Sequence, residues 1–330
     1  MVLAALYPRE NQITLSPRLR RTLPGLLGSL ALVLGLLVAG PAATAHPGQG
    51  HGHGQDHGQV HGRKHGQQGY LALGDSVPFG YRPGAVTTPA QYADESSFVG
   101  YPELLARRSP LRVTNASCAG ETTASMISVT AQSNGCTNSL TSPFGYRDAY
   151  PLHTAYASRS QSQLDFAVAY LRSHRNTRLV TLMIGANDLF VCQKTTASQC
   201  TSAADFGGLL AQVSTNLDRI LSTLRTDGGY AGAIDVVSYY SLDYTDPLQT
   251  GGIQALNAAI ASVATSDGAA IADGFGSMKD ASEPSLQPCT AGLLIALPTG
   301  GCDVHPTRTG QAALARAVAE VSLPSHGHQF

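Results

Sequence analysis

Between residues 70 and 272 the chain contains five short apolar runs, separated by longer mixed segments. Within each run the apolar residues are nearly continuous instead of alternating, which is typical of strands that are covered on both faces. The pattern therefore predicts five buried strands, at Tyr70–Leu73, Leu111–Thr114, Leu179–Ile184, Ile234–Ser238 and Ala269–Ala272.

Four of the segments outside these runs repeat apolar residues with the period of a helix. They are Gln161–His174, Phe206–Leu224, Ile253–Val263 and Arg308–Val321. In the longest of them, apolar residues recur every three or four positions and form one stripe. Strands that alternate with such helices predict an α/β domain in which helices cover both faces of a parallel sheet. Sheets of this kind bind ligands beyond the carboxyl ends of their strands, so functional residues are expected just after each strand.

The first 45 residues have the composition of a targeting segment. Three arginines at 18, 20 and 21 precede an apolar run over 23–39, and Ala43-Thr44-Ala45 offers a small-residue cleavage site. Residues 1–45 are therefore predicted to be a signal peptide, which leaves a secreted protein with no stable membrane span. Export could use either the general route or the twin-arginine route. An uncleaved membrane anchor is the alternative, because the apolar run approaches the length of a bilayer span.

Residues 46–68 are rich in histidine and glycine and contain almost no apolar side chain. Such a segment cannot bury a core, so it is predicted to be a flexible linker ahead of a domain at 69–330. It holds six of the eleven histidines, and a pair such as His51 and His53 could bind a metal ion. A solvated tether that binds nothing is the alternative.

The charge balance and the cysteines narrow the class of protein further. With 21 Lys and Arg against 22 Asp and Glu, the chain lacks the basic excess that a nucleic-acid partner requires. The six cysteines include no Cys-x-x-Cys pair, which disfavours zinc ribbons and thioredoxin-like redox sites. They could pair in many ways, but their short separations favour disulfides between neighbours, which need an oxidising compartment. These would be Cys118–Cys136, Cys192–Cys200 and Cys289–Cys302.

Four motifs lie at predicted strand ends or before the last helix. Gly74-Asp75-Ser76 follows the first strand, where the glycine permits a tight turn that exposes the hydroxyl. Gly120 and Gly185-Ala186-Asn187-Asp188 follow the second and third strands, and they offer a bare N–H and a neutral amide as hydrogen-bond donors. His305 comes before the last helix, which Pro306 is expected to start. Taken singly, the first three motifs also fit ordinary turns, and His305 also fits a surface or core histidine that is not a base.

Taken together and in this order, the four motifs resemble the SGNH (GDSL-like) hydrolase family, in its actinobacterial secreted esterase and lipase branch. The resemblance extends from Tyr70 to about Val321. It implies a flavodoxin-like, three-layer α/β/α sandwich with five parallel strands, and ester hydrolysis without metal or cofactor. It also implies that Ser76 is the nucleophile, that His305 is its base, and that Gly120 and Asn187 stabilise an oxyanion. The chain contains no Gly-x-Ser-x-Gly motif, which argues against an ordinary α/β-hydrolase.

The sequence departs from the family at the last motif, which usually has an aspartate three residues before the histidine. Here Cys302 occupies that position and Asp303 lies two residues before His305. Asp303 is the candidate third catalytic residue if a local bend brings it to the imidazole. Alternatively, a backbone carbonyl orients the ring and Ser76 and His305 work as a dyad.

These observations predict a secreted, monomeric serine esterase or lipase that acts on small-molecule or lipid esters. A carbohydrate O-acetyl esterase is the alternative within the enzymes, although the chain has no tryptophan to stack against a sugar. An alternative of another class is a non-catalytic metal-binding or wall-associated protein that functions through residues 46–65.

Overall fold

The computed structural model describes residues 68–323. The predicted signal peptide, the predicted linker up to residue 67, and the histidine pair at 51 and 53 lie outside the described residues. The first strand begins at Gln68, which the sequence had assigned to the linker. Within 68–323, no helix combines the length and the apolar character needed to cross a membrane.

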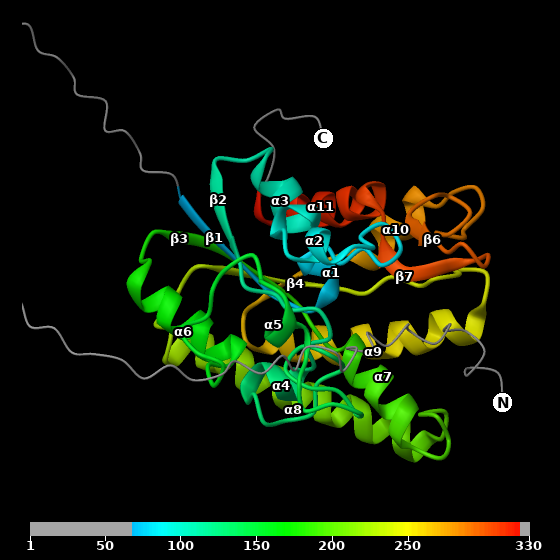
Figure 1. Ribbon diagram of the computed structural model, residues 1–330, viewed down its shortest axis with the longest axis horizontal. Helices are drawn as coiled ribbons and strands as arrows, with labels where there is room; N and C mark the ends of the chain where they lie inside the picture. The colour runs from blue at the N-terminus through cyan, green and yellow to red at the C-terminus, as the bar shows by residue number, and fades with distance from the viewer. Residues whose placement is uncertain (1–67, 324–330) are drawn as a thin grey trace, which may run out of the picture. The chain divides into compact units, whose positions relative to one another are not determined.

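Five parallel strands form the central sheet in the order β2-β1-β3-β4-β5 (Figure 1). Each strand overlaps one of the five apolar runs. β1, the second strand across the sheet, is buried at every residue except its first. The chain winds outward from β1 in both directions, so the order reverses between β1 and β3, and ligands bind at such reversals. The strands are β1 (Gln68–Gly74), β2 (Leu111–Asn115), β3 (Thr177–Met183), β4 (Ala233–Val237) and β5 (Ala270–Ala272).

Helices cover both faces of this sheet (Figure 1). On one face α3 (Tyr101–Ala106) packs against β2, and α11 (Arg308–Ser322) packs against α3, β4, β5 and α10 (Gly274–Ala281). The other layer consists of α4 (Thr123–Ile127), α6 (Gln163–Ser173), α7 (Ala186–Thr195), α8 (Ala203–Thr226) and α9 (Pro247–Ser266). The predicted three-layer α/β/α sandwich is therefore confirmed.

The longest helix shows why the apolar pattern predicted this layer. α8 buries one stripe of aliphatic side chains toward the sheet and its neighbouring helices. Its first turn is stabilised by Ser202, whose side chain accepts a hydrogen bond from the backbone N–H of Asp205. The buried side chains of this stripe are Leu209, Val213, Leu217, Ile220, Leu221 and Leu224.

The expectation that Pro306 starts the last helix is wrong. His305 and Pro306 belong to strand β7 (Cys302–Pro306), which pairs antiparallel with β6 (Leu294–Ala296). The helix begins at Arg308 because Thr307 caps it, with its side chain accepting from the N–H of Gly310. His305 is therefore held by a small sheet and not by a helix start.

The remaining elements are short and follow the strands as connections. The helices among them, together with one 3-10 turn, were not predicted, because an element of three or four residues has no readable period. They are α1 (Ser76–Phe79), α2 (Pro89–Tyr92), the 3-10 turn η2 (Glu95–Ser97) and α5 (Tyr146–Ala149).

Three disulfides join neighbours along the chain, which is the pairing that the short separations favoured. They are Cys118–Cys136, Cys192–Cys200 and Cys289–Cys302. Closing a loop in this way restricts the unfolded chain and stabilises a fold by about 2–4 kcal/mol for each bond. The first disulfide closes the segment that follows β2 and contains Gly120, and the third holds the start of β7, three residues before His305.

Candidate active site

Ser76, Asp303 and His305 come together beyond the carboxyl end of β1. The Nε2 atom of His305 lies 2.8 Å from the Ser76 hydroxyl. The Nδ1 atom on the other side of the ring is hydrogen-bonded to Oδ1 of Asp303. The same carboxylate oxygen accepts the backbone N–H of His305 at 2.9 Å. Asp303 and His305 are two positions apart in strand β7, and side chains at this spacing point to the same face, so the strand brings Asp303 to the imidazole.

The turn before Ser76 is set by a close approach of two strands. Gly74 has a φ of +127°, and a Cβ atom there would lie 2.0 Å from the carbonyl oxygen of Met183 on β3. Only glycine fits, because such a contact would force the strands apart. The next residue, Asp75, donates its own N–H to that carbonyl. Ser76 then becomes the first residue of α1, with its hydroxyl at the edge of the sheet.

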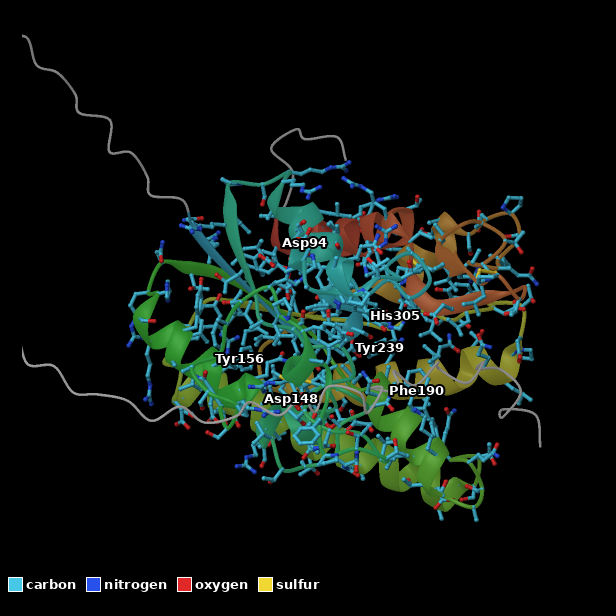
Figure 2. The ribbon with its side chains drawn as sticks, viewed as in Figure 1. Asp94, Asp148, Tyr156, Phe190, Tyr239 and His305 are labelled. Carbon is cyan, nitrogen blue, oxygen red and sulfur yellow. A yellow bond between two sulfur atoms is a disulfide. The ribbon has the colours of Figure 1, made fainter. Side chains whose placement is uncertain are left out.

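The buried side chain of Asp75 stabilises this turn through hydrogen bonds. Its carboxyl group accepts the N–H of Val77 at 2.9 Å and the hydroxyl of Tyr239 at 2.5 Å. Burial raises the pKa of Asp75 to about 6, and these hydrogen bonds oppose that rise. Burial also raises the pKa of Tyr239 well above its ordinary value, so the phenol keeps its proton and remains a donor. Figure 2 labels Tyr239 and His305 in this region.

The neighbouring His305 favours the ionised form of Asp303. Burial by itself raises the pKa of this carboxyl group, but the hydrogen bonds and the charge of His305 outweigh that effect, and on balance the pKa lies below its ordinary value. Asp303 is therefore ionised over the whole range in which a histidine titrates, and it can stabilise an imidazolium ion.

Gly120 and Asn187 follow the two strands that flank β1. Gly120 has a φ of +83°, and a Cβ atom there would lie 2.7 Å from the carbonyl oxygen of Asn134. Asn187 is buried in the first turn of α7, and its Oδ1 accepts a hydrogen bond from the Nδ2 of Asn134 at 2.8 Å. No described residue accepts a hydrogen bond from the N–H of Ser76, the N–H of Gly120 or the Nδ2 group of Asn187. Three adjacent loops thus each present a donor with no partner in the described part of the chain.

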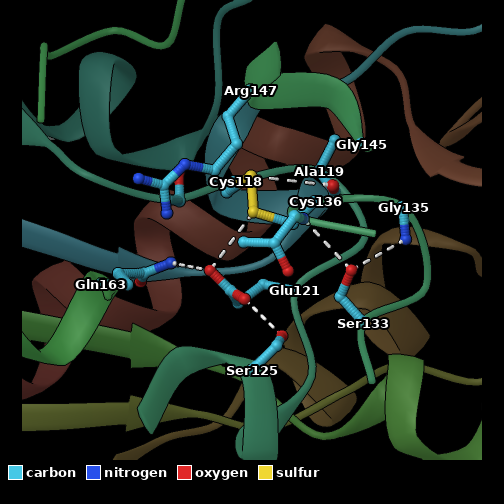
Figure 3. The surroundings of a disulfide bond; sticks show 12 residues. Cys118, Ala119, Glu121, Ser125, Ser133, Gly135, Cys136, Gly145, Arg147 and Gln163 are labelled. Carbon is cyan, nitrogen blue, oxygen red and sulfur yellow. Dashed lines mark hydrogen bonds between the residues drawn. A yellow bond between two sulfur atoms is a disulfide. The ribbon is translucent and has the colours of Figure 1, made fainter. Parts of the chain in front are cut away.

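A buried polar frame connects the first two of these loops, and Figure 3 shows the part of it around Glu121 and Gln163. Gln163 accepts the N–H of Gly74 at 2.6 Å, and it donates to the carbonyl of Gly74 and to Glu121, each at 3.0 Å. Burial raises the pKa of Glu121 to about 7, although Ser125 donates to it. The sulfurs beside Glu121 belong to the disulfide of Cys118 and offer no thiolate to a metal. This frame ties the turn of the candidate nucleophile to the loop of Gly120.

An aromatic wall lies against the imidazole. The ring of Tyr81 meets the ring of His305 edge-on, with 5.1 Å between their centroids. Behind Tyr81 are further aromatic rings from three separate segments, packed together in one cluster. These are Phe79, Tyr92, Phe98, Tyr146 and Tyr150.

Sequence reasoning missed several residues of this region because they act over long separations. Asn134, Gln163 and Tyr239 lie 53, 89 and 164 positions from their partners, in segments without a motif. Gln163 opens a predicted amphipathic helix, where one polar residue carries no signal. Glu121 could have been suspected of belonging to the site, because it directly follows the motif residue Gly120.

Comparison with known proteins places this geometry in context. Residues 72–313 match the profile of the GDSL-like lipase/acylhydrolase family. Among solved structures, phospholipase A1 from Streptomyces albidoflavus is 20% identical with a TM-score of 0.50, covering 77% of this chain and 99% of the other. This likeness shows a shared fold.

Two further structures are similar at lower TM-scores. An extracellular lipase from Streptomyces rimosus is 20% identical with a TM-score of 0.47, covering 77% of this chain and 99% of the other. An acetylxylan esterase from Geobacillus stearothermophilus is 15% identical with a TM-score of 0.44, covering 77% and 93%. No curated protein matches the sequence.

Proposed function

The chain belongs to the GDSL-like lipase/acylhydrolase family and is a carboxylic ester hydrolase, and we propose that Ser76 is its nucleophile and His305 its base. In this proposal Asp303 orients the imidazole ring and stabilises its positively charged form. The observation that carries this proposal is the 2.8 Å contact between Nε2 of His305 and the Ser76 hydroxyl, with Asp303 on Nδ1. Nucleophile and base within hydrogen-bonding distance, with a third group orienting the base, are the signature of an activated serine.

The reaction has two halves. In the first, the Ser76 oxygen attacks the ester carbonyl carbon while Nε2 of His305 takes the hydroxyl proton, and that proton then passes to the departing alcohol. In the second, a water molecule gives a proton to Nε2 and attacks the acyl-enzyme, and the acid leaves as the proton returns to Ser76. The former carbonyl oxygen, which is then negatively charged, accepts hydrogen bonds from the N–H groups of Ser76 and Gly120 and from the side-chain amide of Asn187.

The contact with Asp303 supports a triad over a dyad. A carboxylate on Nδ1 keeps the proton on that nitrogen and leaves the Nε2 lone pair toward the serine. The lowered pKa of Asp303 keeps it charged while the imidazole gains and loses its proton.

Secretion is supported by two independent features. Three disulfides need an oxidising compartment, and residues 1–45 have the composition of a cleaved signal peptide. We propose an extracellular, monomeric enzyme that acts on small-molecule or lipid acyl esters.

The aromatic wall beside His305 supports the proposal that the substrate ester carries an apolar group. Tyr81 brings apolar ring surface against the imidazole, where the acyl chain or the alcohol of a bound ester would lie. A sugar acetyl ester is the competing substrate, and hydrolysis of p-nitrophenyl esters of increasing chain length, measured beside acetylated xylan, separates the two. We expect higher kcat/KM for the longer acyl esters. A preference for acetylated xylan would contradict a lipid or simple acyl substrate.

Deletion of residues 46–67 is expected to leave ester hydrolysis unchanged, because β1 begins at Gln68 and the mechanism uses only residues of the described domain. The measurement is the kcat of p-nitrophenyl butyrate hydrolysis by the mature protein with and without the segment, each before and after EDTA. EDTA is expected to change neither rate, because Ser76 and His305 carry the proton transfers and Asp303 stabilises the imidazolium ion, so no step needs a metal. Loss of activity on deletion or with EDTA would instead make the histidine-rich segment a functional metal site.

A further inference from the structure

We propose that Asn134 and Lys194 are positioning residues that orient and polarise Asn187 as an oxyanion donor. This inference rests on the proposed function, in which the Asn187 amide meets the developing negative charge. Neither residue belongs to a motif of the sequence, and both reach Asn187 through hydrogen bonds.

Three side chains form a relay that begins and ends on α7. The ammonium group of Lys194 donates to Oδ1 of Asn134 at 2.8 Å, and Nδ2 of Asn134 donates to Oδ1 of Asn187 at 2.8 Å. Lys194 lies in the last turn of α7 and Asn187 in its first turn. They are seven residues apart, about two helical turns, and so lie on one side of the helix. Asn134, from the loop between α4 and α5, bridges them.

The lysine decides which way both amides face. An ammonium group has only donors, so Asn134 must turn its oxygen toward Lys194 and its NH₂ group toward α7. Asn187 must then turn its own oxygen toward Asn134, which leaves its NH₂ group as the free donor. Without the lysine, both amides could flip together and keep the bond between them. A flipped Asn187 would present its oxygen to the oxyanion and repel it.

The relay also strengthens the donor. Hydrogen bonds in a chain polarise one another, and the bond at one end is assisted by a full positive charge. Polarisation toward Lys194 leaves the NH₂ group of Asn187 more positive. This polarisation has its largest effect when the carbonyl oxygen has become an oxyanion. It therefore lowers the free energy of the transition state more than that of the bound substrate.

Asn134 also contacts the second donor loop. Its backbone N–H donates to the carbonyl of Gly120 at 2.8 Å, and its own carbonyl lies where a side chain at Gly120 would have to go. The disulfide between Cys118 and Cys136, drawn in Figure 3, closes this segment. In the sequence, Gly120 and Asn134 each lie two residues inside it. One residue thus couples the donors that follow β2 and β3. A side-chain variant of Asn134 keeps its backbone bond, so it tests the relay separately from the loop.

Asn134→Ala in the mature protein tests the relay, with Asn138→Ala as its matched control. Asn138 lies in the same loop, and its side-chain hydrogen bonds to described residues stay within that loop, to Ala131 and to neighbouring polar residues. We expect Asn134→Ala to lower kcat about 10- to 100-fold with KM unchanged, because an oxyanion donor is typically worth about 10²–10³. Its affinity for a trifluoromethyl ketone, which forms a tetrahedral adduct, should fall by the same factor. An equal loss in Asn138→Ala would show that loop order is responsible and would overturn the proposal.

Lys194→Met tests the charge, with Lys279→Met on α10 as its control. We expect a loss of about 3- to 10-fold in kcat for Lys194→Met, recovery in Lys194→Arg, which keeps a cationic donor, and no change for Lys279→Met. Full activity of Lys194→Met, or no recovery with arginine, would overturn the role of the cation.

The double variant separates failure of this inference from failure of the proposed function. Since Asn134 acts through Asn187, Asn134→Ala/Asn187→Ala should be no slower than Asn187→Ala alone. If the two losses multiply, Asn134 acts independently and the relay is overturned, while covalent labelling of Ser76 by an organophosphate would still uphold the serine mechanism. If Ser76 is not labelled in the wild-type protein, the proposed function itself has failed.

Discussion

His305→Ala is expected to reduce ester hydrolysis by about 10⁶-fold in kcat while leaving the fold intact, because one ring serves both halves of the reaction. Without it, the Ser76 hydroxyl keeps its proton and the leaving alcohol receives none. The side chain lies at the edge of the sheet, between Ser76 and Asp303, and its removal leaves the strands of the core untouched. The measurement is the kcat of p-nitrophenyl butyrate hydrolysis, accompanied by circular dichroism.

His174→Ala is the matched control for this variant. His174 ends α6, is exposed, and stacks on Tyr170 away from the site, so its loss should not change kcat. If His305→Ala retained even one-hundredth of wild-type activity, a different base would be at work, since general-base removal from a serine triad costs far more than about 10²-fold.

Asp303→Ala is expected to lower kcat about 10⁴-fold, because it removes both the charge that stabilises the imidazolium ion and the acceptor that fixes its tautomer. Asp303→Asn separates these roles. One oxygen of Asp303 accepts both the backbone N–H and the Nδ1 of His305, and an asparagine oxygen can keep both bonds. The asparagine variant should therefore lose less than the alanine variant, and the remaining loss measures the charge.

The exposed Asp280→Asn on α10 is the control for the change of charge. A loss below about tenfold in Asp303→Ala would mean that the backbone orients His305 by itself, and the dyad would replace the triad.

The sheet and the long helices could be predicted because their patterns are local. Burial can be predicted from a few consecutive residues in continuous apolar runs such as Leu179–Ile184 and in the aliphatic stripe of Phe206–Leu224. Ser76, Gly120 and Asn187 could be expected at one edge because parallel strands present their carboxyl ends together. α7 escaped notice because the residues it buries are Asn187 and Asp188, which are polar.

The parts that could not be predicted depend on geometry that a sequence does not display. Asp303 reaches the imidazole because residues 302–306 form a strand, in which positions 303 and 305 share a face, whereas the sequence analysis placed Pro306 at the start of a helix. Gln163 and Asn134 have partners brought near only by the finished fold. Their single polar side chains have no period and no neighbouring motif from which a role could be read.

The central claim is that Ser76 is the nucleophile, and covalent labelling tests it most directly. The mature protein, and its Ser76→Ala variant, would be treated with diethyl p-nitrophenyl phosphate, and the modified peptide identified by mass spectrometry. The account predicts one phosphoryl adduct, on Ser76, with parallel loss of esterase activity, and neither adduct nor activity in the variant. An adduct on another residue, or a Ser76→Ala protein that still hydrolyses p-nitrophenyl butyrate at the wild-type rate, would contradict it.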